Sequence, residues 1–95
     1  MKTANIQEKL EDACIKGRVS IPDRPAYSVR MISILLNEQC PMTAPSVRII
    51  QKAIAELKCL GIDLAEYKVG HTPYYPRFSV EMILVQLRFK VKSDD

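Results

Sequence analysis

The chain has 95 residues, of which 47% are hydrophobic and 26% charged, and its formal net charge is +3. This composition excludes a disordered chain, and the length leaves no room for a second core, so one folded domain is expected. The positive excess lies in residues 46–93, with eight Lys and Arg against four Asp and Glu, whereas residues 1–45 carry six against five.

Cysteine spacing and hydropathy exclude several other classes. Cys14, Cys40 and Cys59 are an odd number without CxxC spacing, so neither a disulfide framework nor a zinc site is expected. The N-terminal sequence MKTANIQEKLEDA has no apolar stretch of signal-peptide length, and no later run approaches the length of a membrane span. We therefore expect a cytoplasmic protein with no membrane partner.

The first half of the chain predicts two helices. An amphipathic helix is predicted over residues 4–16, where apolar residues recur at helical spacing among charged ones. The connector VSIPDRPAY contains two prolines and is expected to be extended, with Val19 and Ile21 packed against the core. A second helix is predicted over residues 26–38, and its broad apolar stripe makes it the central helix.

The clearest signal is a third helix over residues 45–60. Pro45 suits a first helical turn, and Thr43 or Ser46 can cap its free amides. Gly61 and Ile62 predict a Schellman ending. Its apolar face is formed by Val47, Ile50, Ile54 and Leu57, with Ile49, Ala53 and Leu60 at the margins.

After this helix the pattern changes to alternation. It predicts a strand over residues 62–69, followed by a long loop, GHTPYYPRF. Strict alternation over residues 85–92 predicts a half-buried strand. Its outer cations Arg88, Lys90 and Lys92 are interpreted as protection of a sheet edge. Residues 79–84 fit either the start of this strand or a helical turn, and we prefer the strand.

Together these elements predict an α+β fold. It is a single domain over residues 1–95, with three helices followed by a two-stranded antiparallel ribbon within residues 62–92. A homodimer is expected because so small a domain gains burial by association, with residues 4–16 or strand 85–92 at the interface. The expected core residues are Leu10, Val29, Ile32, Leu36, Val47, Ile50, Ile54, Leu57, Leu87 and Phe89.

Within residues 43–69, the stretch SVRIIQKAIAELKCLGIDLAEY resembles the recognition helix and first wing strand of bacterial winged helix-turn-helix regulators. The resemblance implies a small winged-helix-like domain that binds DNA, with Ser46, Arg48, Gln51 and Lys52 at the positions where the family meets DNA. Either residues 4–16 and 26–38 serve as its first two helices, or the second helix is reduced to the turn CPMTAP.

The outer face of helix 45–60 favours the same function. It carries Arg, Gln and Lys but no acid, and such a face can enter the major groove of double-stranded DNA. We therefore expect a sequence-specific transcriptional regulator, of the type carried by phages and mobile elements. The candidate DNA-binding residues are Ser46, Arg48, Gln51, Lys52 and Ala55 on the helix, and Lys68, His71 and Arg77 around the following loop.

The sequence also bears on two other classes of protein. The modest net charge also suits a protein-binding adaptor, inhibitor or antirepressor on the same scaffold. An enzyme is not expected, because the single histidine, His71, has no Cys or acid at metal-ligand spacing and no Gly-rich phosphate loop is present. We therefore expect no catalytic residues, no metal ligands and no cofactor. The salt dependence of DNA binding separates the regulator from the adaptor.

Overall fold

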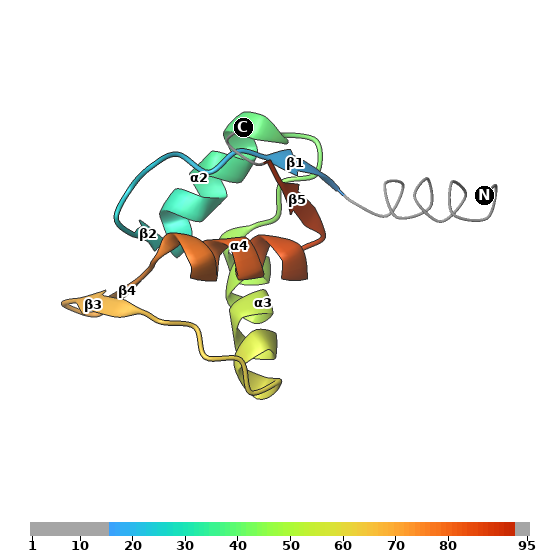
Figure 1. Ribbon diagram of the computed structural model, residues 1–95. Coiled ribbons are helices and arrows are strands. Elements are labelled where there is room, and N and C mark those ends of the chain that lie inside the picture. The colour runs from blue at the N-terminus through green and yellow to red at the C-terminus, as the bar shows by residue number, and fades with distance from the viewer. Residues whose placement is uncertain (1–15, 93–95) are drawn as a thin grey trace.

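The computed structural model describes residues 16–92, and the structural statements below concern these residues. The helix expected over residues 4–16, and Leu10 with it, lies outside them. Figure 1 shows helices at the centre, a strand pair at one end and a hairpin that projects from the body. The elements are β1 (Gly17–Val19), β2 (Tyr27–Ser28), α2 (Val29–Gln39), α3 (Val47–Cys59), β3 (Tyr67–Val69), β4 (Thr72–Tyr75), α4 (Arg77–Gln86) and β5 (Phe89–Val91).

The fold is α+β, as expected, and its core lies where the three helices of the described part meet. The helix expected from residue 26 begins later, at Val29, because Tyr27 and Ser28 pair with β4. Ser28 caps α2 by accepting a hydrogen bond from the Met31 amide at 3.2 Å. The connector before it behaves as predicted, since Val19 and Ile21 are buried.

Helix α3 has the ends that the sequence predicts. Ser46 is its cap, with the hydroxyl oxygen accepting from the Ile49 amide at 3.4 Å, so Pro45 precedes the cap instead of lying in the first turn. At the other end Gly61 has φ +82°, and the Ile62 amide donates to the Leu57 carbonyl at 3.1 Å. This is the predicted Schellman ending.

The buried face of α3 is narrower than its apolar pattern. Ile50, Ala53, Ile54 and Leu57 are buried, in the i, i+3, i+4, i+7 spacing of a single stripe. Val47 is 38% exposed, Ile49 48% and Leu60 70%, so placing Val47 in the core was wrong. These three side chains lie roughly 70–90° around the helix from the centre of the stripe, at 3.6 residues per turn, so they reach the margin of the packed face.

The strand predicted over residues 85–92 is wrong in its first half. Residues Arg77–Gln86 form α4, and only Phe89–Val91 form a strand, β5. Val80, Ile83 and Leu84 are fully buried at helical spacing, whereas Val85, expected to point inward, is 65% exposed. Contact with α3 therefore decides between two periods that the sequence fits equally.

The predicted loop GHTPYYPRF also contains regular structure. Strands β3 and β4 form an antiparallel hairpin whose two-residue turn is Gly70–His71, with Gly70 at φ +65°. Strand β2 adds to β4, so the sheet has three strands in the order β2-β4-β3, not the two expected. Pro73 fits in β4 because β2 pairs only with Tyr74 and Tyr75, which leaves one side of Pro73 unpaired.

A second, two-stranded sheet joins the two ends of the described chain. Strands β1 and β5 are parallel, with Arg18 opposite Lys90. The turn after α2 packs against β1, where the Thr43 hydroxyl donates to the Lys16 carbonyl at 2.8 Å. A Cβ atom on Gly17 would lie 2.6 Å from the Cys40 sulfur, so only glycine allows this approach.

Candidate nucleic-acid interface

The outer face of α3 carries most of the residues predicted from the sequence. Arg48, Gln51, Lys52 and Ala55 are all exposed, on the side of the helix opposite to the buried Ile50 and Leu57. We call these four residues the α3 stripe. It offers two cations, one side-chain amide and one methyl group, and none of its members is acidic. Side chains of this kind can donate to guanine or adenine edges and to phosphates.

Ser46 stands at the N-terminal end of the α3 stripe. Its hydroxyl oxygen accepts from the Ile49 amide, so its own proton remains able to donate to an anion. The first turn of α3 contains no acid. The positive end of the helix therefore favours a phosphate group at this position.

The C-terminal end of α3 is tied to the segment that leads into the hairpin. Lys58 Nζ lies 2.9 Å from Glu66 Oε1, and this hydrogen bond raises the pKa of Lys58. The buried Ser79 hydroxyl donates to the Ala65 carbonyl at 3.2 Å and holds the same segment against α4. These contacts fix the base of the hairpin relative to α3.

The remaining predicted residues do not form one cluster. Lys68 and His71 are exposed on the β3–β4 hairpin, whose tip stands away from α3 in Figure 1. Arg77 is the first residue of α4, at the foot of the hairpin, and its Nε lies 3.4 Å from Glu81 Oε1. The α3 stripe and the hairpin are thus separate surfaces, and only an extended ligand reaches both.

Two cations that the sequence did not place at the site lie beside Lys52. Lys16 and Arg88 line one groove of about 430 Å³ with Lys52, between α3 and the end of α4. Among the described residues that line this groove, Glu56 is the one acid. Only the pairing of β1 with β5 brings Lys16 to Arg88, where the Lys16 amide donates to the Arg88 carbonyl at 2.7 Å. No local pattern signals this neighbourhood.

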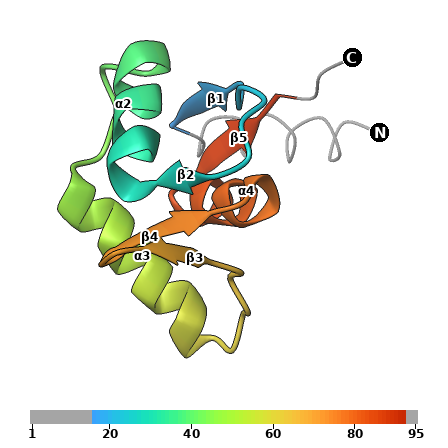
Figure 2. The same cartoon turned by 90° about the vertical axis from the view of Figure 1, so that its left-hand side faces the viewer.

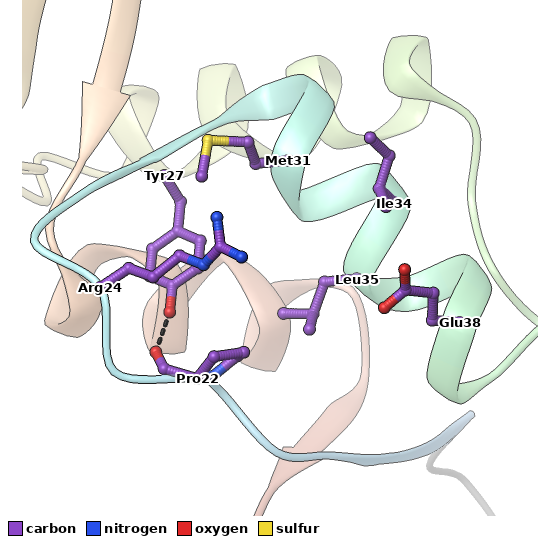
Figure 3. Close-up of a pocket in the computed structure, with 7 residues that line it drawn as sticks. All are labelled: Pro22, Arg24, Tyr27, Met31, Ile34, Leu35 and Glu38. Atoms are coloured by element: carbon purple, nitrogen blue, oxygen red, sulfur yellow. Dashed lines mark hydrogen bonds between the residues drawn. The ribbon is translucent and has the colours of Figure 1, made fainter.

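A second hollow lies between α2 and the connector before it (Figure 3). Its volume is about 290 Å³, near the lower end of the roughly 300–1,000 Å³ typical of ligand sites. Figure 3 shows Tyr27 with its hydroxyl donating to the Pro22 carbonyl, so that group is already engaged. The other lining residues are Met31, Ile34 and Leu35, which are apolar, and the charged Arg24 and Glu38.

Metal binding and membrane insertion find no support in residues 16–92. No group of three His, Cys, Asp or Glu side chains there is arranged to hold a metal ion, and Cys40 and Cys59 are free thiols. In the same part of the chain no helix has the length and apolar character needed to cross a bilayer.

A scan against protein-family models and searches of curated proteins and of solved structures find no match.

Proposed function

We propose that this protein is a small sequence-specific DNA-binding regulator that reads the major groove with α3. The observation that carries the proposal is that the α3 stripe is exposed and contains no acid, on a helix whose opposite side packs Ile50, Ala53, Ile54 and Leu57 into the core. Because Ile50, Ile54 and Leu57 fix the rotation of α3, its polar side chains are presented in one direction before any ligand arrives.

The arrangement around α3 supports the resemblance to winged-helix proteins. Helices α2 and α3 are joined by the short turn 40–46 and pack on each other, as in a helix-turn-helix. The β3–β4 hairpin follows α3 in the chain, as a wing follows a recognition helix, and β2 pairs with its returning strand. In this proposal α2 is the helix that precedes the recognition helix, so the turn CPMTAP does not stand in for a helix.

Each predicted residue has a role in this proposal. Arg48, Gln51 and Lys52 contact base edges, and Ala55 leaves space for the floor of the groove. Ser46 and the first turn of α3 hold a phosphate, whereas Lys68, His71 and Arg77 contact the backbone from the hairpin and its foot. A homodimer would place two copies of α3 on adjacent half-sites, as helix-turn-helix proteins commonly do.

Selection of bound duplexes from a random pool tests this function. Enrichment of one motif by the parent protein, lost in a folded Arg48→Ala/Gln51→Ala/Lys52→Ala variant, is the expected result. Enrichment that survives the triple substitution would exclude α3 as the reading element. A pool that stays random with the parent would exclude sequence-specific binding altogether.

A protein-binding adaptor, inhibitor or antirepressor is the second candidate. An apolar groove of about 410 Å³ between the end of α3 and α4 favours it, with Leu57, Ile62, Met82 and Val85 among its lining residues. Val85 is 65% exposed there, so its side chain is accessible to a partner. The same groove is the candidate homodimer surface, in place of the strand expected over residues 85–92. Light scattering on the parent and on Val85→Glu tests self-association at high micromolar concentration.

A further inference from the structure

A row of cations covers the outer face of the β1–β5 sheet. The exposed positions alternate with buried ones along both strands, as the pleat requires. Arg18 on β1 stands directly opposite Lys90 on β5, and the Lys92 amide donates to the Val19 carbonyl at 2.8 Å. We call this surface the basic strip, and its residues are Lys16, Arg18, Arg88, Lys90 and Lys92.

Edge protection does not account for the whole basic strip. Cations on β5 alone would discourage the addition of another strand. Arg18, however, extends the row of cations onto β1, where it lies directly opposite Lys90. A groove of about 360 Å³ runs between Arg18 and Lys90, and its charged lining residues within residues 16–92 are the cations Arg18, Lys90 and Lys92. Cations gathered in this way favour a polyanion as the ligand.

The basic strip is continuous with the α3 stripe. Lys16 and Arg88 belong to the strip and also line the groove that contains Lys52 of α3. Cations therefore extend from α3 across the end of α4 and along β5 to Lys92. In Figure 1 the hairpin tip projects to the left and the β1–β5 pair lies at the right of the coloured ribbon, and in Figure 2 the pair lies above the hairpin. This surface consequently leads away from the hairpin.

We propose that the basic strip binds the phosphate backbone of the same duplex that α3 reads, so that DNA is held beside α4 as well as beside the hairpin. This inference rests on the proposed function and adds a contact surface to it. Continuity through Lys52 favours double-stranded DNA over a lipid surface or an acidic protein, because neither of those needs the α3 stripe. Phosphate contacts of this kind add affinity without reading sequence.

The test compares two charge-matched variants of the full chain. Lys90→Gln/Lys92→Gln removes two exposed cations of the basic strip, and Arg24→Gln/Arg30→Gln removes two exposed cations beside or on α2. Both are used only if their melting temperatures match the parent. Each phosphate contact contributes about 0.9 to the slope of log affinity against log salt. The strip variant should therefore flatten that slope by about two with unchanged base preference, and the control should leave it near that of the parent.

Other outcomes separate this inference from the proposed function. Equal slopes for the two double variants would overturn the basic strip as a contact while leaving sequence-specific binding by α3 in place. A second outcome is weakened binding by the strip variant together with an Arg48→Ala/Gln51→Ala/Lys52→Ala variant that binds as the parent does. That outcome would support the basic strip as a contact and overturn α3 as the element that reads the bases. If the parent binds phosphatidylserine vesicles and no duplex, both proposals fail.

Discussion

The side chain of Gln39 pairs with both main-chain groups of Ser20. The Ser20 amide donates to Gln39 Oε1 at 2.7 Å, and Gln39 Nε2 donates to the Ser20 carbonyl at 2.7 Å. The side chain of the last residue of α2 thus forms with Ser20 the two hydrogen bonds that the main chain of a neighbouring strand could form. It fastens the connector that leaves β1 to the helix that precedes α3.

Replacing Gln39 should loosen this connection. Gln39→Ala removes both hydrogen bonds and is expected to lower the free energy of unfolding by about 1–3 kcal/mol, since each bond contributes roughly 0.5–1.5 kcal/mol. Urea denaturation measures the change, with the neighbouring exposed position in Glu38→Ala as control. Equal midpoints for the two variants would show that the paired hydrogen bonds contribute nothing.

Gly17 and Cys40 should behave as a coupled pair. Gly17→Ala places a Cβ atom 2.6 Å from the Cys40 sulfur, and overpacking of this kind costs about 1–3 kcal/mol. Cys40→Ala removes the atom that clashes, so Gly17→Ala should cost less in that background. A double-mutant cycle by urea denaturation measures the coupling. Additive effects would contradict the close approach of β1 to the turn after α2.

Two isoleucines of α3 provide a matched test of its rotation. Ile54 is 6% exposed and Ile49 is 48% exposed, although the same substitution removes the same atoms from each. Ile54→Ala should lower the free energy of unfolding by about 2–5 kcal/mol. Ile49→Ala should cost much less because no comparable cavity forms. Equal costs would contradict the rotation that presents the α3 stripe to solvent.

Alkaline pH should destabilise the fold through its buried tyrosines. Burial raises the pKa of Tyr75 above its ordinary value of 10.0, and the Glu66 carboxylate adds to the rise while Lys58 opposes it. Burial also raises the pKa of Tyr27. The unfolded chain therefore loses these protons first, so their contribution is fully present below about pH 10 and is lost as the pH rises through the folded-state pKa.

The substitution Tyr75→Phe isolates this effect. It removes one titrating hydroxyl, so the variant should lose less stability than the parent between about pH 8 and pH 11. Urea midpoints at both pH values give the comparison. Identical losses in parent and variant would mean that Tyr75 has the same pKa in the folded and unfolded states.

The sequence predicts α3 well because its signals are local. Ser46, Gly61 and Ile62 act within one turn of the helix, and each has the predicted contact. Helix α4 was missed because Leu87 fits both the helical series from Val80 and the alternating series to Val91. Only packing against α3 chooses between these patterns. The hairpin was missed as well, because the prolines of GHTPYYPRF favour a loop although Thr72–Tyr75 form β4.

The candidate site also has a part that local sequence signals predict and a part that depends on tertiary contacts. Exposure of the α3 stripe follows from helical periodicity, and the structure has all four residues exposed. Arg77 was expected in a loop but begins α4, where Glu81 lies beside it. The neighbourhood of Lys16 and Arg88 depends on pairing between opposite ends of the described chain, which no sequence window contains.

Base contacts and backbone contacts should differ in kind. Arg48→Ala is expected to relax base preference at one position of the site, at a cost of about 1–3 kcal/mol. Lys68→Ala, on the exposed face of the hairpin, should weaken all duplexes alike and flatten the salt slope by about one unit. Titrations of single-base variants of the selected site at several salt concentrations separate the two. If Arg48→Ala weakens binding to all duplexes alike, Arg48 contacts the DNA backbone and not a base.

Competition between the selected duplex and a scrambled duplex tests the central claim most directly. The parent protein should prefer the selected duplex, with a steep dependence on salt, and the folded Arg48→Ala/Gln51→Ala/Lys52→Ala variant should bind both duplexes with the same weak affinity. A parent that binds neither duplex, or a triple variant that keeps the preference, would contradict the assignment of α3 as a recognition helix.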